Sequence, residues 1–198
     1  MDAFDADVLI YASAPGHEQG RRVAALFSKA PGERAGVGSA LLVPELLRKP
    51  LCDGHPDAVR ELAALLARLD LRPVDRATAM IATVLAARYR LRSADAIHLA
   101  TAIAIGAHRF ITSNTRDFPQ TITEIDVTYP GDLPEIALRR PGGEDPVDGV
   151  PDLLARFLAR DAGHQQLVVV RVLVPDGRDH GQGDRPLVQV PGSRGTAW

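Results

Sequence analysis

Residues 91–118 read LRSADAIHLATAIAIGAHRFITSNTRDF and combine a helix pattern with a strand pattern. Ser93 precedes an alanine-rich run that Gly106 closes, which are start and stop signals of a helix. RFITSN, at 109–114, is apolar and ends in polar groups, which predicts a buried strand. Asp95 lies in the first turn of the predicted helix. Two consecutive elements, this helix and the strand after it, therefore each carry polar side chains at one end.

Strand and helix patterns also alternate before and after this stretch. FDADVLIYA, at residues 4–12, predicts a short buried strand that ends at its acids. GVGSALLVPELLRKPL predicts a short strand or turn that leads into a helix, with Ser39 as N-cap and Glu45 among leucines. Apolar spacing predicts further helices over 17–29, 57–69 and 76–89, the last with Asp75 as N-cap, and short strands over 71–75 and 126–129.

This alternation predicts an α/β protein with a central, mainly parallel sheet covered on both faces by helices. In such sheets ligands bind beyond the carboxyl ends of the strands. Asp5 and Asn114 both fall at such ends. A catalytic or binding site is therefore expected there.

Composition restricts the function classes. The chain has 198 residues, 45% of them hydrophobic, which suits one domain with an appendage. No apolar run approaches the ~20 residues of a membrane span, so a soluble, cytoplasmic protein without membrane contact is expected. The net charge of −2 argues against a basic wrapping surface for nucleic acid but not against an acidic metal site. Cys52 is the single cysteine and predicts neither a disulfide nor a zinc site.

The character of the chain changes after about residue 138. We expect a domain over 1–138 and a C-terminal extension over 139–198. The extension begins with a linker rich in proline, glycine and charge. A helix over 152–160 and a strand over 166–174 are predicted next, followed by a loose tail.

Acids within apolar runs need a cap, an ion pair or a metal, because an unpaired buried carboxylate is costly. Asp5, Glu45 and Asp95 are such acids, and together they would suit Mg²⁺ or Mn²⁺. Each also has a structural reading: Asp95 as a helix N-terminal acid and Glu45 as a helix-surface residue. His98, one turn after Asp95, reads either as a general base or as a packed helix histidine.

Residues 91–118 resemble the most recognisable stretch of PIN domains: an acid followed by AIHLATA, a glycine, and a strand ending in a Thr-x-Asp or Thr-x-Asn element. FDADVLIYA resembles the family's opening strand, and VPELL at 43–47 resembles the helix that supplies its glutamate. The resemblance covers roughly residues 1–138 in the family's order and spacing. It implies a three-layer α/β/α fold of the VapC toxin type.

The resemblance assigns catalytic and metal-binding roles to Asp5, Glu45 and Asp95. The family's fourth acid falls at Asn114, whose amide oxygen is a weaker ligand than a carboxylate. Asp117, three residues later, would compensate directly or through water, and one or two metal ions are compatible with this set. Supporting roles fall to Asp7, as a hydrogen-bonding organiser around Asp5, and to Thr112. RNA-binding roles are expected for Arg48, Arg92 and Arg116, which lie close in sequence to these ligands.

The resemblance implies a Mg²⁺- or Mn²⁺-dependent endoribonuclease that leaves 5′-phosphate and 3′-hydroxyl ends. It also implies a type II toxin–antitoxin pair, a homodimer, and an antitoxin whose C-terminal segment blocks the acidic site.

Two alternatives stay open on the sequence. FDADVLI also resembles the DxD strand of haloacid-dehalogenase-type phosphatases, with Asp5 as nucleophile, Asp7 as acid/base and Thr112 in the second motif. No lysine follows Lys49, and Asp95 precedes Thr112, which is the wrong order for that class. The other alternative is a PIN fold that has lost catalysis and serves as a binding module, as Asn114 suggests.

Overall fold

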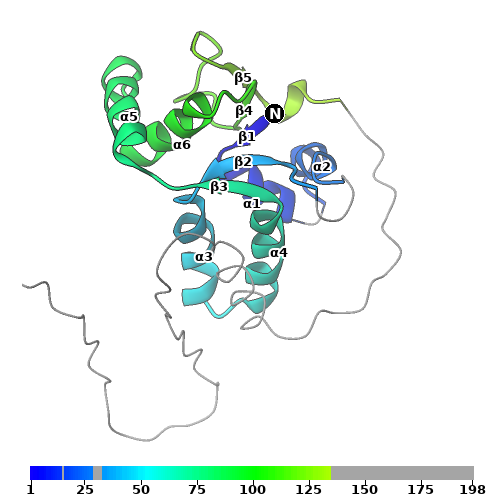
Figure 1. Ribbon diagram of the computed structural model, residues 1–198. Helices are drawn as coiled ribbons and strands as arrows, with labels where there is room; N and C mark the ends of the chain where they lie inside the picture. Colours follow the sequence, from blue (N-terminus) through cyan, green and yellow to red (C-terminus); the bar gives the residue numbers. More distant parts are fainter. Residues whose placement is uncertain (15, 29–32, 135–198) are drawn as a thin grey trace, which may run out of the picture. The chain divides into compact units, whose positions relative to one another are not determined.

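The centre of the protein is a parallel sheet. A computed structural model describes residues 1–14, 16–28 and 33–134 (Figure 1). The sheet has the strand order β3-β2-β1-β4-β5, and every neighbouring pair is parallel. Its strands are β1 (Asp2–Phe4), β2 (Gly36–Ser39), β3 (Leu69–Arg72), β4 (Arg109–Ile111) and β5 (Asp126–Thr128). The predicted mainly parallel sheet is confirmed.

Helices connect the strands, as a parallel sheet requires. They are α1 (Ala6–Ser13), α2 (Glu18–Ala25), α3 (Leu42–Cys52), α4 (Pro56–Ala67), α5 (Arg76–Tyr89) and α6 (Ser93–Ala104), followed by the short 3₁₀ helix η1 (Pro130–Asp132). The prediction of a helix over 76–89 is confirmed, and Asp75 caps it by accepting a hydrogen bond from the Thr78 amide at 2.8 Å. The helix predicted over 17–29 is shorter, with His17 as its N-cap.

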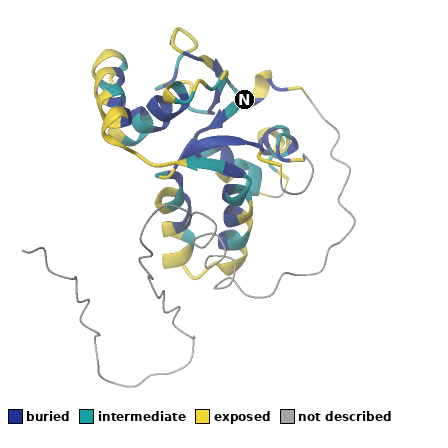
Figure 2. Cartoon of the chain, in the orientation of Figure 1, coloured by how far each residue is buried: buried dark blue, intermediate teal, exposed yellow. Residues whose placement is uncertain are grey.

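Two hydrophobic cores lie on opposite faces of the sheet, because successive strand residues point to opposite sides. On β1, Phe4 packs in the core formed with α1 to α4, whereas Ala3 packs in the core formed with α5 and α6. On β4, Ile111 packs in the core with α1 to α4, and Phe110 packs in the core with α5 and α6. Figure 2 shows the buried residues concentrated on the strands and on the helices beside them. The predicted three-layer α/β/α fold is confirmed.

The strand predicted to end at the acids of FDADVLIYA lies further toward the N-terminus, and Phe4 is the part of this segment that belongs to it. The strand ends at Phe4, and α1 begins at Ala6 with Asp5 as its N-cap. The Asp5 carboxylate accepts a hydrogen bond from the Ala6 amide at 2.8 Å, which satisfies one free donor of the first helical turn. A short apolar run does not distinguish a buried strand from a buried helix, which explains the error.

A smaller correction concerns Ser39. This residue ends β2, and the N-cap of α3 is Leu41, which has no side-chain capping bond. The Ser39 hydroxyl accepts from the Leu41 amide at 3.1 Å instead. Ser39 thus stabilises the turn between strand and helix rather than the helix terminus itself.

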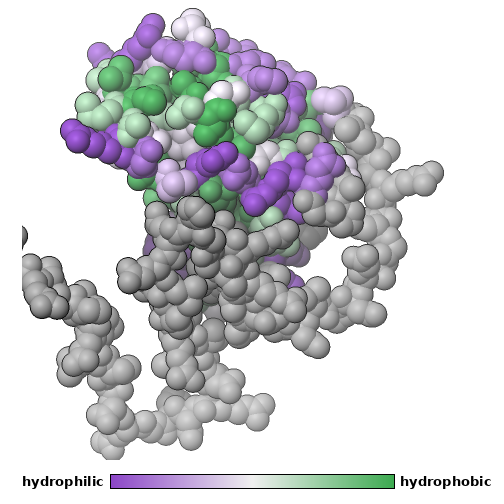
Figure 3. Space-filling model, in the orientation of Figure 1, coloured by the Kyte–Doolittle hydropathy of each residue, from purple (hydrophilic) through white to green (hydrophobic). Residues whose placement is uncertain are grey.

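Exposed apolar side chains are few on the described surface. Met80 and Val84, four residues apart on α5, are the most exposed of the large ones, at 61% and 64%. Hydrophobic colour is visible over this part of the molecule in Figure 3. No helix among the described residues is long and apolar enough to cross a membrane. The helix and strand predicted over 152–160 and 166–174 lie outside the described residues.

Arg90, which follows α5, has a left-handed backbone with φ of 57°. Such a conformation strains any residue with a Cβ atom but not glycine, so Arg90→Gly should raise the free energy of unfolding by roughly 0.5 to 1 kcal/mol. The matched control is Ala87→Gly at an exposed position inside α5, which should lower it by about 1 kcal/mol. Urea denaturation measures both. Equal destabilisation by the two variants would contradict the assigned conformation.

Candidate active site

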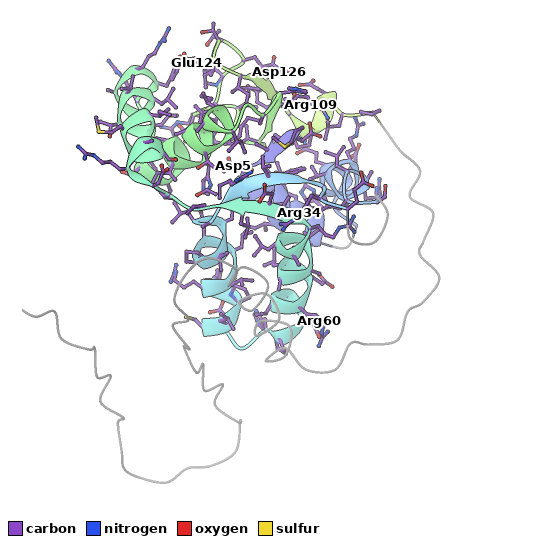
Figure 4. The ribbon with its side chains drawn as sticks, viewed as in Figure 1. Asp5, Arg34, Arg60, Arg109, Glu124 and Asp126 are labelled. Carbon is purple, nitrogen blue, oxygen red and sulfur yellow. The ribbon has the colours of Figure 1, made fainter. Side chains whose placement is uncertain are left out.

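Asp5 is the central side chain of the candidate site. It follows β1 directly, and its backbone amide donates to the Ile111 carbonyl at 3.0 Å, which continues the pairing of β1 with β4. The Asp5 carboxylate accepts from the Ala6 amide and from the Thr112 hydroxyl, both at 2.8 Å. Only 5% of the residue is exposed. Figure 4 shows Asp5 at the opposite end of the central strands from Arg109.

Burial of this carboxylate changes its acidity. The pKa of Asp5 rises from 3.8 to about 7, first because the buried carboxylate loses hydration and second because the negative charge of Asp7 is close. His98 and the hydrogen bonds from Thr112 and Ala6 act in the opposite direction. A negative charge on Asp5 is therefore costly in the absence of a cation.

Asp7 lies in the first turn of α1, because the chain turns into a helix after Asp5. Its Oδ2 accepts from the amide of Ser113 at 3.1 Å and also from the Ser113 hydroxyl. Its Oδ1 is buried and has no hydrogen-bond partner in the described structure. Burial raises the pKa of Asp7. Sequence reasoning did not single out Ser113, whose only signal was its position at the polar end of a predicted strand.

Asp95 and His98 lie on α6, three residues apart and hence on one face of the helix. Asp95 is partly buried, and its pKa is raised by burial and by the negative charge of Asp117. His98 is buried, and its Nε2 lies 2.7 Å from Oε2 of Glu45 on α3. This hydrogen bond lowers the pKa of Glu45.

The positions of Asp5, Glu45 and Asp95 are linked through His98. The imidazole of His98 lowers the pKa of Asp5 and of Asp95 electrostatically, and it bonds Glu45 directly. Glu45 in turn raises the pKa of Asp95. The structure thus brings three acids that are distant in sequence near one imidazole. Of the two readings of His98, the packed helix histidine agrees with its burial, and the contact with Glu45 was not foreseen.

Asn114 and Asp117 bond to each other. The Asn114 amide group donates to Asp117 Oδ2 at 2.9 Å, and its Oδ1 accepts from the Asp117 backbone amide at 3.1 Å. The Asn114 backbone amide donates to the Thr112 hydroxyl at 3.1 Å. Asp117 acts electrostatically on Asp95, so its carboxylate faces the same region. Asn114 is engaged in shaping this loop.

The predicted RNA-binding arginines do not share one place. Arg92 precedes α6 and lowers the pKa of Asp95, so it lies near the acids. Arg116 is 92% exposed in its side chain and lies 4.0 Å from Asp117. Arg48 acts on Asp53 at the end of α3, and no described contact connects it to the acids. Arg92 and Arg116 are the better placed of the three.

The donor set matches a hard cation in its chemistry. Its oxygens are carboxylates, which suit Mg²⁺ or Mn²⁺ rather than zinc. The buried Oδ1 of Asp7 has no hydrogen-bond partner in the described structure, and the pKa of Asp5 is raised first by burial and second by the negative charge of Asp7. As placed, however, no three Asp, Glu, His or Cys side chains of the described residues form a ready group of metal ligands. The residues fit a cation in the chemistry of their donors, and the side chains would have to move to form a complete ligand group.

A family model for the PIN domain matches residues 3–122. The chain belongs to the PIN domain family. PIN domains are generally nucleases that act on nucleic acid and depend on divalent metals. This match favours the nuclease interpretation over the phosphatase alternative.

Two solved structures are similar to the chain. A toxin–antitoxin complex from Klebsiella pneumoniae has a matching chain 25% identical, with a TM-score of 0.52, covering 66% of this chain and 98% of that chain. VapBC2 from Rickettsia felis, bound to a DNA fragment from its promoter, matches at 15% identity and a TM-score of 0.51, covering 65% and 97%. The fold is that of VapC-type PIN domains. A search among curated proteins gave no significant match.

The raised pKa of Asp5 makes stability depend on pH in an unusual direction. Between pH 3.8 and about 7 the unfolded carboxyl loses its proton while the folded one keeps it, so stability falls as pH rises through this window. In EDTA at pH 8, Asp5→Asn should therefore be more stable than wild type by roughly 1 to 4 kcal/mol. At pH 4 the difference should disappear. Urea denaturation at both values tests this, and an equal effect at pH 4 and pH 8 would contradict it.

Proposed function

We propose that this PIN domain is a Mg²⁺- or Mn²⁺-dependent endoribonuclease and the toxin of a type II toxin–antitoxin pair. The observation that carries the proposal is the grouping of Asp5, Glu45 and Asp95 around His98. Asp5 follows the carboxyl end of β1, the end of a strand at which α/β proteins bind their ligands, and Glu45 and Asp95 lie in the first turns of α3 and α6. A carboxylate group of this kind is suited to hold a cation against a phosphate.

The proposed ligands divide into fixed and adjustable ones. Asp5 is fixed, because two hydrogen bonds and burial hold its carboxylate. Asp95 and Glu45 are partly exposed and reach the site from helices on either side of the sheet. Asp117 is the next acid beside Asp95, and Asn114 is a weaker ligand. A bound Mg²⁺ or Mn²⁺ would supply Lewis-acid activation of the scissile phosphate and of the attacking water.

Substrate attraction requires positive charge, since the acids alone repel RNA. Arg92 and Arg116 lie near the acids and would contact phosphates of the RNA. Few cations contribute, so binding should depend on salt less steeply than in a basic wrapping protein. We propose the same role for Arg48, which lies on α3 and acts on Asp53.

The partner proposal is supported by the solved relatives. The Klebsiella pneumoniae structure is a toxin–antitoxin complex, and the Rickettsia felis structure holds VapBC2. For this chain we propose an antitoxin whose C-terminal segment covers the acidic site. A homodimer is proposed on the family resemblance, and light scattering of the purified protein tests it.

Cleavage of RNA tests the proposed activity. Wild-type protein with Mn²⁺ should cut structured RNA and leave 5′-phosphate ends, and EDTA should abolish the reaction. Asp5→Asn and Asp95→Asn should each slow cleavage by about 100-fold or more, because each removes a charged ligand. Gel analysis of 5′-labelled RNA gives the rates.

The matched control is Asp57→Asn, on the exposed surface of α4. This variant should cleave like wild type. A single-stranded DNA of the same sequence, tested in parallel, separates a ribonuclease from a general nuclease. Equal cleavage by wild type, Asp5→Asn and Asp95→Asn would contradict the assignment, as would no cleavage of any RNA.

The hydrogen bonding of Asn114 favours one second candidate function. The family's fourth acid is replaced by an amide whose polar atoms both bond to Asp117. A PIN fold weakened in this way would bind RNA or protein without cutting. Calorimetry with Mn²⁺ distinguishes the two: an active site should bind Mn²⁺ and lose this binding in Asp5→Asn, whereas a binding module should show no Mn²⁺ binding in either protein.

A further inference from the structure

His98 is a buried polar residue that the proposed chemistry does not use. Its side chain is 1% exposed on α6, and packing therefore fixes the ring. Nε2 lies 2.7 Å from Glu45 Oε2, whereas the buried Nδ1 has no hydrogen-bond partner in the described structure. Nε2, on one edge of the ring, is thus hydrogen-bonded, whereas Nδ1, on the other edge, makes no described polar contact. The described hydrogen bond of the ring is therefore the one with Glu45.

Glu45 is the least constrained of the three acids. It lies in the first turn of α3, and 39% of its side chain is exposed. A glutamate at such a position can adopt several rotamers, and fixing it in one of them costs conformational entropy. Its one described hydrogen bond within the site is with His98. Without this bond, nothing else described would hold the carboxylate toward Asp5 and Asp95.

We propose that His98 is a positioning residue, whose Nε2–H group holds the Glu45 carboxylate toward the other acids. The inference rests on the proposed function, since it concerns how the cation site is assembled. α6 then supplies one ligand directly, through Asp95, and orients a second from α3, through His98 one turn later. Hydrogen bonds from outer residues to metal ligands commonly change metal affinity by about 10- to 100-fold.

Two variants of similar polarity separate this role from simple packing. In His98→Gln the side-chain nitrogen can reach the position of Nε2 and can still donate to Glu45. In His98→Asn the nitrogen reaches only the position of Nδ1, which has no partner. Both variants replace a buried ring by an amide, so their effects on folding should be similar.

The measurement is the affinity for Mn²⁺ by calorimetry, with thermal unfolding of the metal-free protein as the folding control. His98→Asn should bind Mn²⁺ about 10- to 100-fold more weakly than wild type, and His98→Gln within about threefold of it. Both should lose similar amounts of thermal stability. Equal Mn²⁺ affinities of the two variants would overturn the proposal.

Glu45→Ala provides a second test at a half-exposed position, where folding is not at risk. If His98 acts through Glu45, adding His98→Asn to Glu45→Ala should weaken Mn²⁺ binding no further. In the metal-free wild type, the ring should give a ¹H–¹⁵N signal for Nε2–H that shifts in Glu45→Ala. Additive losses of affinity, or an unchanged signal, would contradict the positioning role.

The outcomes also separate this inference from the proposed function. If wild type binds Mn²⁺ and Asp5→Asn does not, the proposed cation site is supported. The His98 variants alone then decide the inference. If wild type binds no Mn²⁺, the proposed function fails and the role toward a cation fails with it. The ring signal would still report whether His98 bonds Glu45 in solution.

Discussion

The cost of gathering carboxylates in a partly buried place is the constraint on which the site depends. Asp5 loses water on burial and lies beside Asp7, which together raise its pKa to about 7. The protein offsets part of this cost with donors: Thr112 and Ala6 to Asp5, and Ser113 to Asp7. The part of this cost that the donors do not offset favours the binding of a cation.

The parallel sheet makes this gathering possible. Because all strands run in one direction, their carboxyl ends meet at one edge, and β1 and β4 place Asp5 and Thr112 side by side there. The helical layers contribute from both faces, Glu45 from α3 and Asp95 from α6. The fold thus places polar residues at the carboxyl ends of the strands, while apolar side chains fill both cores.

The described acids form a neighbourhood rather than a finished ligand group. Glu45 is tied to His98 and Asn114 to Asp117, so several candidate ligands already have partners in the protein. Such partners hold the side chains in place at little cost and still leave free lone pairs on the oxygens. The hydrogen bonds from His98 to Glu45 and from Ser113 to Asp7 are the described contacts that orient these two acids.

The sequence alone determined the alternation of strands and helices, the parallel sheet, the helix over 76–89 with its cap at Asp75, and the family. These features depend on local periodicity and on short motifs. The turn into α1 at Ala6, the bond between Asp7 and Ser113, and the contact between His98 and Glu45 were decided by tertiary structure. The two contacts join residues that meet only because the layers pack together, and Glu45 and His98 are 53 positions apart in a sequence that carries no local signal that their side chains touch.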